Sequence, residues 1–397
     1  MFQTIQAAPP DAILGLTEAF KADTNPEKIN LGVGIYQDEH GKTPVLDTVR
    51  EATKRLADQQ TTKAYLPIPG DAAYCSAVQQ MMFGAEHEIV QSGRAMTAHT
   101  PGGTGALRVV GDFLKQNVPS ATLYLTDPTW ANHPAIYASA GVPTATVPYF
   151  DKATNGLAFD ALLDAIATLP AGNAILLHGC CHNPTGIDPT PEQWKQLAAA
   201  VYERGVLPVL DFAYQGFAEG IDEDAVGLRE FCQPGAEFVI CSSYSKNFGL
   251  YRERVGAVTF VAESAERQAV VASQVKRVIR TLYSNPPAHG AALVSTILGD
   301  KELTCQWYGE VAAMRDRING MRDMLVAKLT EHGAPGDYSF IQQQRGMFSF
   351  SGLTKEQVAT LRAEDSIYIV GSGRINVAGI TEANLDRLCA AIARVVA

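Results

Sequence analysis

Residues 174–186 read AILLHGCCHNPTG, and residues 205–216 read GVLPVLDFAYQG. Each stretch contains a short apolar run, Ala174–His178 or Val206–Leu210, and then becomes polar within a few residues. Apolar runs of this length without strict alternation are typical of strands buried on both faces, as in a parallel sheet covered by helices. The two stretches therefore predict parallel strands that each carry a polar cluster at the carboxyl end.

Three other short runs have the same character, and longer stretches of helical pattern separate them. Ala95–His99 leads into TPGGTG at 100–105, Thr122–Thr126 into DPTW at 127–130, and Phe238–Cys241 into SYSK at 243–246. This alternation predicts an α/β fold with a mostly parallel sheet between helices. Ligands of open α/β sheets bind beyond the carboxyl ends of the strands, so we expect the five polar clusters to meet in one crevice.

The two ends of the chain differ from the middle. The segment from Asp11 to Pro44 is loop-rich, whereas Leu303 to Leu329 has apolar residues at helical spacing and predicts one long helix that joins two domains. After that helix come strand candidates at Met347–Phe350, Ile367–Val370 and Arg374–Val377, a capping pattern at Thr354–Gln357 and a final helix from Thr381. We expect a large domain over residues 44–313 and a smaller α+β domain built from residues 1–43 and 314–397.

Composition places the chain among globular proteins. It has 397 residues, 46% of them hydrophobic and 19% charged, and its formal net charge of -10 argues against a nucleic-acid surface, which needs clustered Lys and Arg. No apolar stretch approaches the roughly 20 residues that cross a bilayer, and the N-terminus lacks the pattern of a secretory signal. The seven cysteines are scattered and odd in number, which favours free thiols and a cytoplasmic protein.

The glycine-rich segment at residues 100–105 lies between a predicted strand and a helix that should begin near Ala106. Backbone N–H groups in such a turn, together with the helix dipole, form a cradle for an anion such as phosphate. The segment matches neither the P-loop nor the dinucleotide-binding glycine pattern, so ATP and NAD are poor candidates. Glycine-rich turns also serve plain packing, and the turn alone does not decide between these roles.

Two ionisable residues stand at the ends of apolar strands. Lys246 has hydroxyl residues and Arg254 nearby, and a lysine whose pKa is lowered by burial or by a cation forms Schiff bases with carbonyl compounds. The alternative is an ordinary solvated lysine. Asp211 should be semi-buried, where a carboxylate needs a cationic partner such as a protonated pyridine nitrogen. The alternative for Asp211 is to cap the helix that follows.

Together these segments resemble the class I (fold-type I) aminotransferases, which use pyridoxal 5'-phosphate, and within them the aspartate and aromatic aminotransferase subgroup. The motifs that carry the resemblance are TPGGTG at 100–105, CHNPTG at 181–186, DFAYQG at 211–216 and the segment from Ser243 to Gly256. The similarity extends from NLGVG at 30–34 to GRINVAG at 373–379, which is essentially the whole chain. It implies the fold-type I architecture of pyridoxal-phosphate-dependent transferases.

The resemblance also implies a role for each residue that matches a motif. Lys246 forms the Schiff base and moves a proton, Asp211 pairs with the pyridinium nitrogen, and Tyr214 hydrogen-bonds the phenolic oxygen of the cofactor. The other implied cofactor contacts are Asn183 at the phenolic oxygen, Trp130 on the ring, His133 and His178 behind Asp211, and Gly102, Gly103, Thr104, Ser243, Ser245, Arg254 and a neighbouring subunit's Tyr65 at the phosphate.

Two further arginines match substrate-binding positions. Arg374 matches the arginine that binds the substrate α-carboxylate in a bidentate contact, and Gly34, Trp130 and Asn183 are the other implied substrate contacts. Arg280 matches the arginine that crosses from the neighbouring subunit to bind a side-chain carboxylate. The resemblance therefore implies a homodimer with shared active sites.

The substrate pair expected from these arginines is L-aspartate and 2-oxoglutarate, with reversible transfer of the amino group through the pyridoxamine form of the cofactor. The pocket positions that differ between the two subgroups are mostly polar or small, as in aspartate-selective members, although Ala64 departs from that pattern: they are Ile35, Gln37, Thr43, Ala64, Thr104 and Asn285. An aromatic aminotransferase that acts on Tyr, Phe and Trp and also accepts dicarboxylates is the alternative.

Three other functions fit the sequence less well. A decarboxylase or β-lyase with the same cofactor is disfavoured because a firmly held α-carboxylate resists loss. A cofactor-dependent transcriptional regulator would need a basic DNA-binding module. A metal site at Cys180, Cys181 and His182 is disfavoured because adjacent residues are too close for tetrahedral ligation, so we expect no metal.

Overall fold

The computed structural model describes residues 2–7 and 14–397. Contacts within the chain divide it into a larger compact unit, Pro44–Asp316, and a smaller one, Met1–Thr43 with Arg317–Ala397. The division falls inside the long helix α12 (Lys301–Glu331), which contains the helix predicted from Leu303 to Leu329. The sequence analysis puts the boundary between residues 313 and 314, in the same helix.

The larger unit is built on a seven-stranded sheet with the order β2-β10-β9-β8-β7-β3-β4. All of its strands run parallel except β10, which is antiparallel to both of its neighbours. The strands are β2 (Ala95–Pro101), β3 (Leu123–Asp127), β4 (Thr144–Pro148), β7 (Ala174–His178), β8 (Leu207–Phe212), β9 (Phe238–Ser243) and β10 (Val255–Val261). The predicted α/β fold with a mostly parallel sheet is confirmed.

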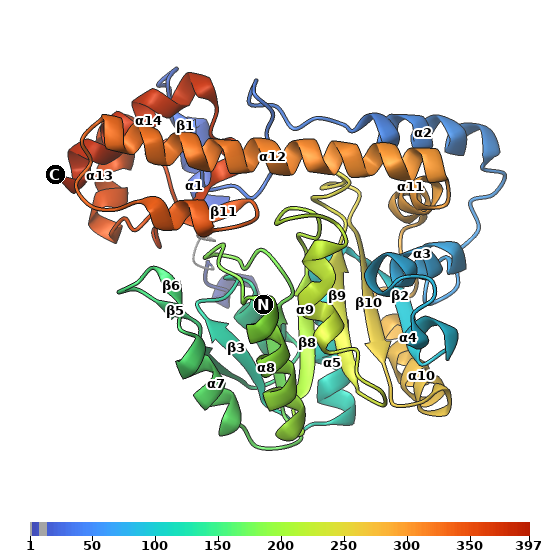
Figure 1. Ribbon diagram of the computed structural model, residues 1–397. Coiled ribbons are helices and arrows are strands. Elements are labelled where there is room, and N and C mark those ends of the chain that lie inside the picture. The colour runs from blue at the N-terminus through green and yellow to red at the C-terminus, as the bar shows by residue number, and fades with distance from the viewer. Residues whose placement is uncertain (1, 8–13) are drawn as a thin grey trace. The chain divides into compact units, whose positions relative to one another are not determined.

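Helices cover both faces of this sheet. On one face, α5 (Gly102–Asn117) and α10 (Ala265–Leu282) pack on each other and on β2 and β10. On the other, α8 (Pro191–Glu203) and α9 (Val226–Glu230) lie in front of the strands in Figure 1. The remaining elements of the unit are α2 (Asp47–Gln59), α3 (Ala72–Phe83), α4 (Glu88–Gln91), α6 (His133–Ser139), β5 (Phe150–Asp151), β6 (Gly156–Leu157), α7 (Phe159–Ala167), η2 (Glu223–Ala225) and α11 (Ala288–Leu298).

Three features of this unit differ from the sequence-based expectation, and the first is strand β4 (Thr144–Pro148), which none of the five predicted apolar runs covers. Strand β10 is not predicted, because its VGAVTFV sequence at residues 255–261 directly follows the lysine segment and the sequence analysis assigns its first residues to that motif. Helix α5 begins at Gly102 and not near Ala106. Glycine is a weak helix former, which hides the true start, and Gly102 enters the helix with a φ of 73° that favours glycine.

The smaller unit contains a helix that the sequence analysis treats as loop. Within the segment from Asp11 to Pro44, residues 11–13 lie outside the described part, but α1 (Leu14–Ala22) is helical. Tertiary contacts hold this short helix: Leu16 packs against Gly32, and the Phe20 ring meets the edge of the Tyr368 ring with centroids 5.4 Å apart. Because short helices are marginal alone, the sequence of α1 gives little sign of it.

The rest of the smaller unit follows the prediction closely. The expected capping box at Thr354 and Gln357 opens α13, and the expected final helix is α14. The three predicted strands are present in shorter form as β11, β12 and β13. The elements are η1 (Phe2–Thr4), β1 (Ile29–Asn30), η3 (Ser339–Gln343), β11 (Phe348–Phe350), α13 (Lys355–Asp365), β12 (Ile367–Tyr368), β13 (Arg374–Asn376), η4 (Val377–Gly379) and α14 (Glu382–Val396), with β1 pairing parallel to β12 and β11 antiparallel to β13.

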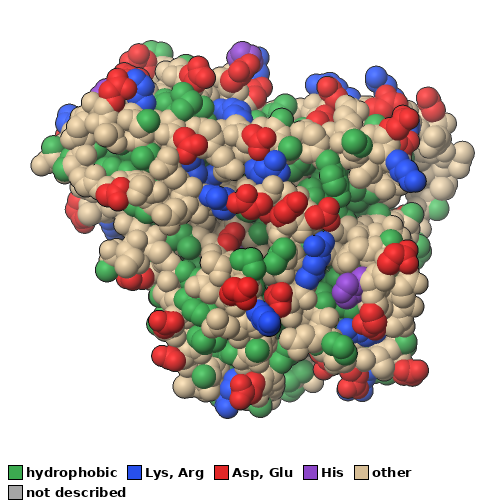
Figure 2. Space-filling view, in the orientation of Figure 1, with side chains coloured by type: hydrophobic (Ala, Val, Ile, Leu, Met, Phe, Trp, Pro, Cys, Tyr) green, Lys and Arg blue, Asp and Glu red, His purple; other side chains and the backbone are tan. Residues whose placement is uncertain are grey.

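Lys and Arg side chains are scattered among Asp and Glu over the face shown in Figure 2. This mixed surface accompanies a formal net charge of -10. In the described part of the chain, no helix combines the length and the apolar character needed to cross a membrane. On this face, a site for an anion would have to be formed by a local group of donors, because no broad basic surface is visible.

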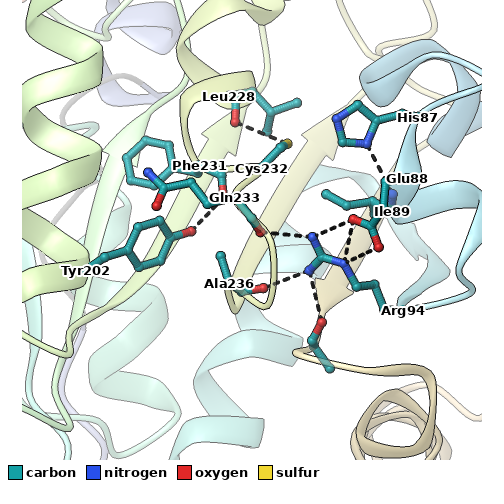
Figure 3. A network of polar contacts seen from close by, with 11 residues as sticks. His87, Glu88, Ile89, Arg94, Tyr202, Leu228, Phe231, Cys232, Gln233 and Ala236 are labelled. Atoms are coloured by element: carbon teal, nitrogen blue, oxygen red, sulfur yellow. Dashed lines mark hydrogen bonds and ion pairs between the residues drawn. The ribbon is translucent and has the colours of Figure 1, made fainter.

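A buried arginine ties the amino end of β2 to the loops beside it (Figure 3). Arg94 is 2% exposed, and its Nε donates to both carboxylate oxygens of Glu88, at 3.1 and 3.0 Å. Its two terminal nitrogens donate to the backbone carbonyls of Ala236, Ala262 and Gln233, at 2.9, 3.1 and 3.0 Å. One guanidinium thus donates to three loop carbonyls next to β9 and β10, of which that of Gln233 also accepts the N–H of Ala236 at 3.1 Å.

Replacing Arg94 with methionine should lower the stability of the fold. The variant leaves the carbonyls of Ala236 and Ala262 without their donor, and unsatisfied buried groups cost roughly 1–3 kcal/mol each, so we expect a loss of about 2–6 kcal/mol. Urea unfolding followed by circular dichroism measures it. Arg50→Met is the matched control, because the Arg50 side chain is 62% exposed and its ion pair with Asp47 is 4.0 Å long. Equal midpoints for the two variants would contradict the prediction.

Candidate active site

The five predicted polar clusters come together at one edge of the sheet in the larger unit. Because β2, β3, β7, β8 and β9 run parallel, their carboxyl ends lie at the same edge. The residues at or just beyond these ends are Gly102, Gly103 and Thr104 after β2, Trp130 and His133 after β3, His178 and Asn183 on and after β7, Asp211 and Tyr214 on and after β8, and Ser243, Ser245, Lys246 and Arg254 on and after β9.

Backbone and side-chain donors converge where α5 begins. A Cβ atom on Gly102 would displace the Arg254 guanidinium, and the φ of 73° at this residue also favours glycine. A Cβ atom on Gly103 would lie 3.1 Å from the Cβ of Ser243. The Arg254 guanidinium donates to Ser245 Oγ at 3.3 Å, and the two serine hydroxyls are also 3.3 Å apart. No carboxylate of the described residues pairs with Arg254, so the first turn of α5, two hydroxyls and one cation form an anion cradle.

Lys246 lies beside this cradle, half-buried, with its Nζ 4.7 Å from the centroid of the Tyr214 ring. Burial lowers the pKa of Lys246 to about 8, the negative charge of Asp211 opposes this shift, and the positive charge of Arg254 adds to it. Among the described residues, no hydrogen bond or ion pair holds Nζ. A substantial fraction of the amine is therefore neutral near pH 8 and able to attack a carbonyl, which favours the Schiff-base role over that of an ordinary solvated lysine.

Asp211 is a buried carboxylate with one of its oxygens unused. It is 5% exposed, and His133 Nε2 lies 3.0 Å from Oδ2, while His133 Nδ1 lies 2.8 Å from the Thr129 hydroxyl. Burial raises the pKa of Asp211, but the hydrogen bond and charge of His133, together with the charges of His178 and Lys246, outweigh burial and the net pKa is lowered. No described residue donates a hydrogen bond to Oδ1. The carboxylate caps no helix, so that alternative is wrong; it offers an ionised oxygen to a cation.

Three buried imidazoles stand behind this carboxylate. The His178 ring lies 5.2 Å from that of His133 and 4.3 Å from that of His182, measured between centroids. Burial and the neighbouring His133 lower the pKa of His178 to about 3, so His178 is neutral. Both ring nitrogens of His182 meet hydroxyls, Thr126 Oγ1 at 3.1 Å and Thr185 Oγ1 at 2.9 Å. The sequence analysis considered His182 only as a metal ligand and missed this supporting position, which no local pattern reveals.

The loops after β3 and β7 bring two more predicted residues to the crevice. The Trp130 ring meets the His133 ring edge-on, with centroids 5.2 Å apart. Asn183 is 4% exposed in a loop that Asp188 organises by accepting the backbone N–H groups of Cys181 and His182, at 2.6 and 2.9 Å. Asp188 is a second residue that sequence analysis missed.

Tyr65 and Arg280 do not join this cluster within the chain. The Tyr65 side chain is 92% exposed. Arg280 is also exposed at the end of α10, where its guanidinium donates to the Ser284 hydroxyl. A large aromatic residue held in solvent and an arginine with no carboxylate partner among the described residues are both available to a second molecule.

Arg374 and Gly34 lie in the smaller unit, close to each other through Phe348. Arg374 is 5% exposed, its Nη2 donates to the carbonyl of Gly32 at 2.7 Å, and its guanidinium lies 4.1 Å from the centroid of the Phe348 ring. A Cβ atom on Gly34 would lie 2.8 Å from the same ring, which explains the glycine. The Asn376 side-chain amide donates to the carbonyls of Val33 and Ile35, on either side of Gly34, at 2.7 and 2.8 Å. Arg374 is thus a rigidly held cation.

The chemistry of the larger unit is that of a lysine amine beside an anion cradle and a buried carboxylate. A neutral amine can attack a carbonyl carbon, the cradle suits an anion such as phosphate, and the buried carboxylate suits a cation. The fold and these groups are those of an α/β enzyme with a lysine suited to covalent chemistry. The chain belongs to the class I and II aminotransferases, whose family pattern matches residues 26–392.

Relatives at high identity confirm the resemblance seen in the motifs. An aspartate aminotransferase of Haemophilus influenzae is 52% identical over 395 residues, covering all of both chains. An aromatic-amino-acid aminotransferase of Pseudomonas aeruginosa is 45% identical over 396 residues, covering all of this chain and 99% of the relative. The crystal structure of an aromatic-amino-acid aminotransferase from Burkholderia pseudomallei, covalently bound to pyridoxal phosphate, is 47% identical, covers both chains fully and has a TM-score of 0.98.

Proposed function

We propose that this aminotransferase binds pyridoxal 5'-phosphate through Lys246 and transfers the amino group reversibly between L-aspartate and 2-oxoglutarate. One observation carries the proposal: Lys246, with a lowered pKa, shares its crevice with a vacant oxygen on buried Asp211 and with the anion cradle at Gly102. These three groups fit an aldehyde, a pyridinium and a phosphate in turn. When bound, the cofactor supplies an electron-poor ring that stabilises negative charge at the substrate Cα.

Two residues would support this chemistry: Lys246 would transfer a proton, and Asp211 would supply a negative charge. Lys246 Nζ would be the base that takes the proton from the substrate Cα and delivers it to the cofactor carbon C4′, which is the proton shift that transamination requires. Asp211 stays ionised because His133 holds its Oδ2, and it keeps the pyridine nitrogen protonated. Tyr214 and Asn183 would donate to the phenolic oxygen, and Trp130 would stack on the ring.

The phosphate would bind in the cradle. Its donors are the backbone of Gly102, Gly103 and Thr104 at the start of α5, the hydroxyls of Ser243 and Ser245, and the Arg254 guanidinium. His133 and His178 would act from behind Asp211: His133 holds one carboxylate oxygen, and the buried ring of His178 packs beside that of His133.

The proposed substrates are dicarboxylates. Arg374, buried and held by a carbonyl and an aromatic face, would bind the α-carboxylate beside the Gly34 backbone. The aspartate aminotransferase of Haemophilus influenzae, at 52% identity, supports aspartate as the substrate. The two aromatic-amino-acid aminotransferases, at 45% and 47% identity, support the alternative. The mostly polar or small pocket positions favour aspartate.

Steady-state assays with 2-oxoglutarate as acceptor test the substrate proposal. We expect kcat/KM for aspartate to exceed that for phenylalanine at least about tenfold, since an arginine left without its carboxylate loses a charged hydrogen bond. Oxaloacetate should be the product from aspartate, and alanine would indicate decarboxylation. A phenylalanine value equal to or larger than the aspartate value would establish the aromatic alternative.

We further propose that the enzyme is a cytoplasmic homodimer in which Tyr65 and Arg280 serve the partner's active site. Their exposure supports this, and the seven free cysteines agree with a reducing compartment. Lys246→Ala and Arg280→Ala proteins should each be impaired with aspartate, but unfolding and refolding them together should restore about a quarter of wild-type activity through mixed dimers. An absence of recovery, or a monomer by sedimentation, would contradict the shared site.

A further inference from the structure

A second buried carboxylate lies behind the proposed active site, outside the residues assigned so far. Asp224 is 6% exposed and sits in the short η2 helix. Its Oδ2 accepts the backbone N–H groups of Gly216 and Ala218 at 2.8 and 3.0 Å, and its Oδ1 accepts those of Glu219 and Gly220 at 2.8 and 3.2 Å. One side chain therefore fixes four of the five amides that follow Gln215.

These amides belong to the turn that carries Tyr214. The Tyr214 carbonyl accepts from the N–H of Phe217 at 3.0 Å and from the Cys181 thiol at 3.8 Å. Gly216, which lies between Tyr214 and Phe217 in the chain, has a φ of 97°, a conformation that other residues rarely adopt. Asp224 holds the amide of Gly216 itself, so it stabilises the sharp bend directly after Tyr214.

The same turn is bonded to the lysine segment. Asn247, adjacent to Lys246 in the chain, donates from its amide to the carbonyl of Gln215 at 3.2 Å. Gln215 in turn donates to the carbonyl of Ile221 at 2.8 Å, which closes the loop that Asp224 fills. The carbonyl of Asn247 accepts the indole N–H of Trp307 at 2.8 Å. One continuous group of hydrogen bonds thus fixes the turn after Tyr214 relative to the segment that contains Lys246.

No other role accounts for this carboxylate. Burial raises the pKa of Asp224, the four amides partly offset that rise, and no cation of the described residues forms an ion pair with it. Cys180, Cys181 and Asp224 could in principle approach a metal, but both carboxylate oxygens already accept two N–H groups each. Burying a carboxylate is costly, so its presence here indicates that the loop it orders has a role.

We propose that Asp224 is a positioning residue that sets the Tyr214 hydroxyl relative to Lys246 by fixing the turn after Tyr214. This inference rests on the proposed function, because it requires Tyr214 to act on the bound cofactor. It assigns the carboxylate no contact with substrate or cofactor. Its effect on the cofactor passes through the Tyr214 hydroxyl, on a turn that Asn247 also bonds to the lysine segment.

A double-mutant cycle tests this dependence. The variants are Asp224→Asn, Tyr214→Phe and the pair, and the readout is the pH midpoint of the visible absorbance of the enzyme loaded with pyridoxal 5'-phosphate. Tyr214→Phe should shift the midpoint by about one pH unit, as the loss of a hydrogen bond to one protonation state does. Asp224→Asn presents an N–H group to two amides, and it should shift the midpoint in the same direction by at least about half a unit.

In the Tyr214→Phe background, Asp224→Asn should produce almost no further shift, because its effect acts through the missing hydroxyl. Asp222→Asn, an exposed carboxylate two residues away, should leave the midpoint unchanged. Shifts that add independently, or an unchanged midpoint in folded Asp224→Asn, would overturn the inference. If Asp224→Asn does not fold, Asp224→Ser, which leaves room for water to serve the amides, is judged by the same cycle. A wild-type protein with no visible band would refute the proposed function instead.

Discussion

Lys246→Ala should reduce kcat for transamination by at least about 10⁴-fold, since it removes a general base worth up to about 10⁴ in rate together with the covalent link to the cofactor. The structure gives the reason: Nζ is the group in the crevice whose pKa is lowered to about 8, and no described residue competes for it. Initial rates with aspartate and 2-oxoglutarate measure the loss.

The control for this prediction is Lys276→Ala, which removes an exposed lysine from α10 and should leave kcat unchanged. Borohydride reduction followed by peptide mass analysis gives a readout independent of rate. The wild-type peptide that contains residue 246 should gain the mass of the reduced cofactor, and the Lys246→Ala peptide should not. An undiminished rate in the variant, or a label on another lysine, would refute the role of Lys246.

Replacing Lys246 should stabilise the apoprotein although it abolishes activity. Because burial holds the pKa of Lys246 near 8 while the unfolded value is 10.5, the native state binds fewer protons between these pH values, and wild-type stability should rise with pH across that window. Below pH 8 the burial cost is fully present, and about 1.4 kcal/mol per pH unit gives a cost of up to about 3 kcal/mol. Lys246→Met apoprotein should therefore be more stable than wild type at pH 7, and this difference should shrink toward pH 10.

The residues at the strand ends could be predicted because their signal is local. Asp211 and Lys246 each follow a short apolar run, and parallel strands bring such ends to one edge whatever the details of packing. The glycine-rich turn after β2 is likewise visible in the sequence, but the start of α5 at Gly102 and its approach to Arg254 are not.

The supporting residues could not be predicted because their partners lie elsewhere. Arg94 bonds carbonyls 139 to 168 residues away, so nothing near it in the sequence indicates its role. Asp224 bonds amides only four to eight residues distant, but in an irregular loop without periodicity. Helix α1 exists through contacts such as Phe20 with Tyr368, which only the folded chain provides.

Asp211→Asn should lower kcat by about 10² to 10⁴-fold, because breaking a buried charge pair costs roughly 3–5 kcal/mol and about 1.4 kcal/mol corresponds to a factor of ten. Asparagine keeps the shape of the side chain and can still bond His133 but carries no charge for the pyridine nitrogen. Asp211→Glu, which keeps the charge at a longer reach, should retain more activity than Asp211→Asn. Asp164→Asn, on the exposed side of α7, should match wild type.

The pH dependence of stability offers a second test of Asp211. Its native pKa lies below the usual value of 3.8, so the stability that its pairing with His133 provides is present above that value and is lost as the pH falls through the lowered pKa. The difference in unfolding free energy between wild type and Asp211→Asn should therefore be largest near neutral pH and shrink below about pH 4. A difference that stays constant down to pH 3, or a kcat for Asp211→Asn within about tenfold of wild type, would show that no ionised carboxylate is needed at this position.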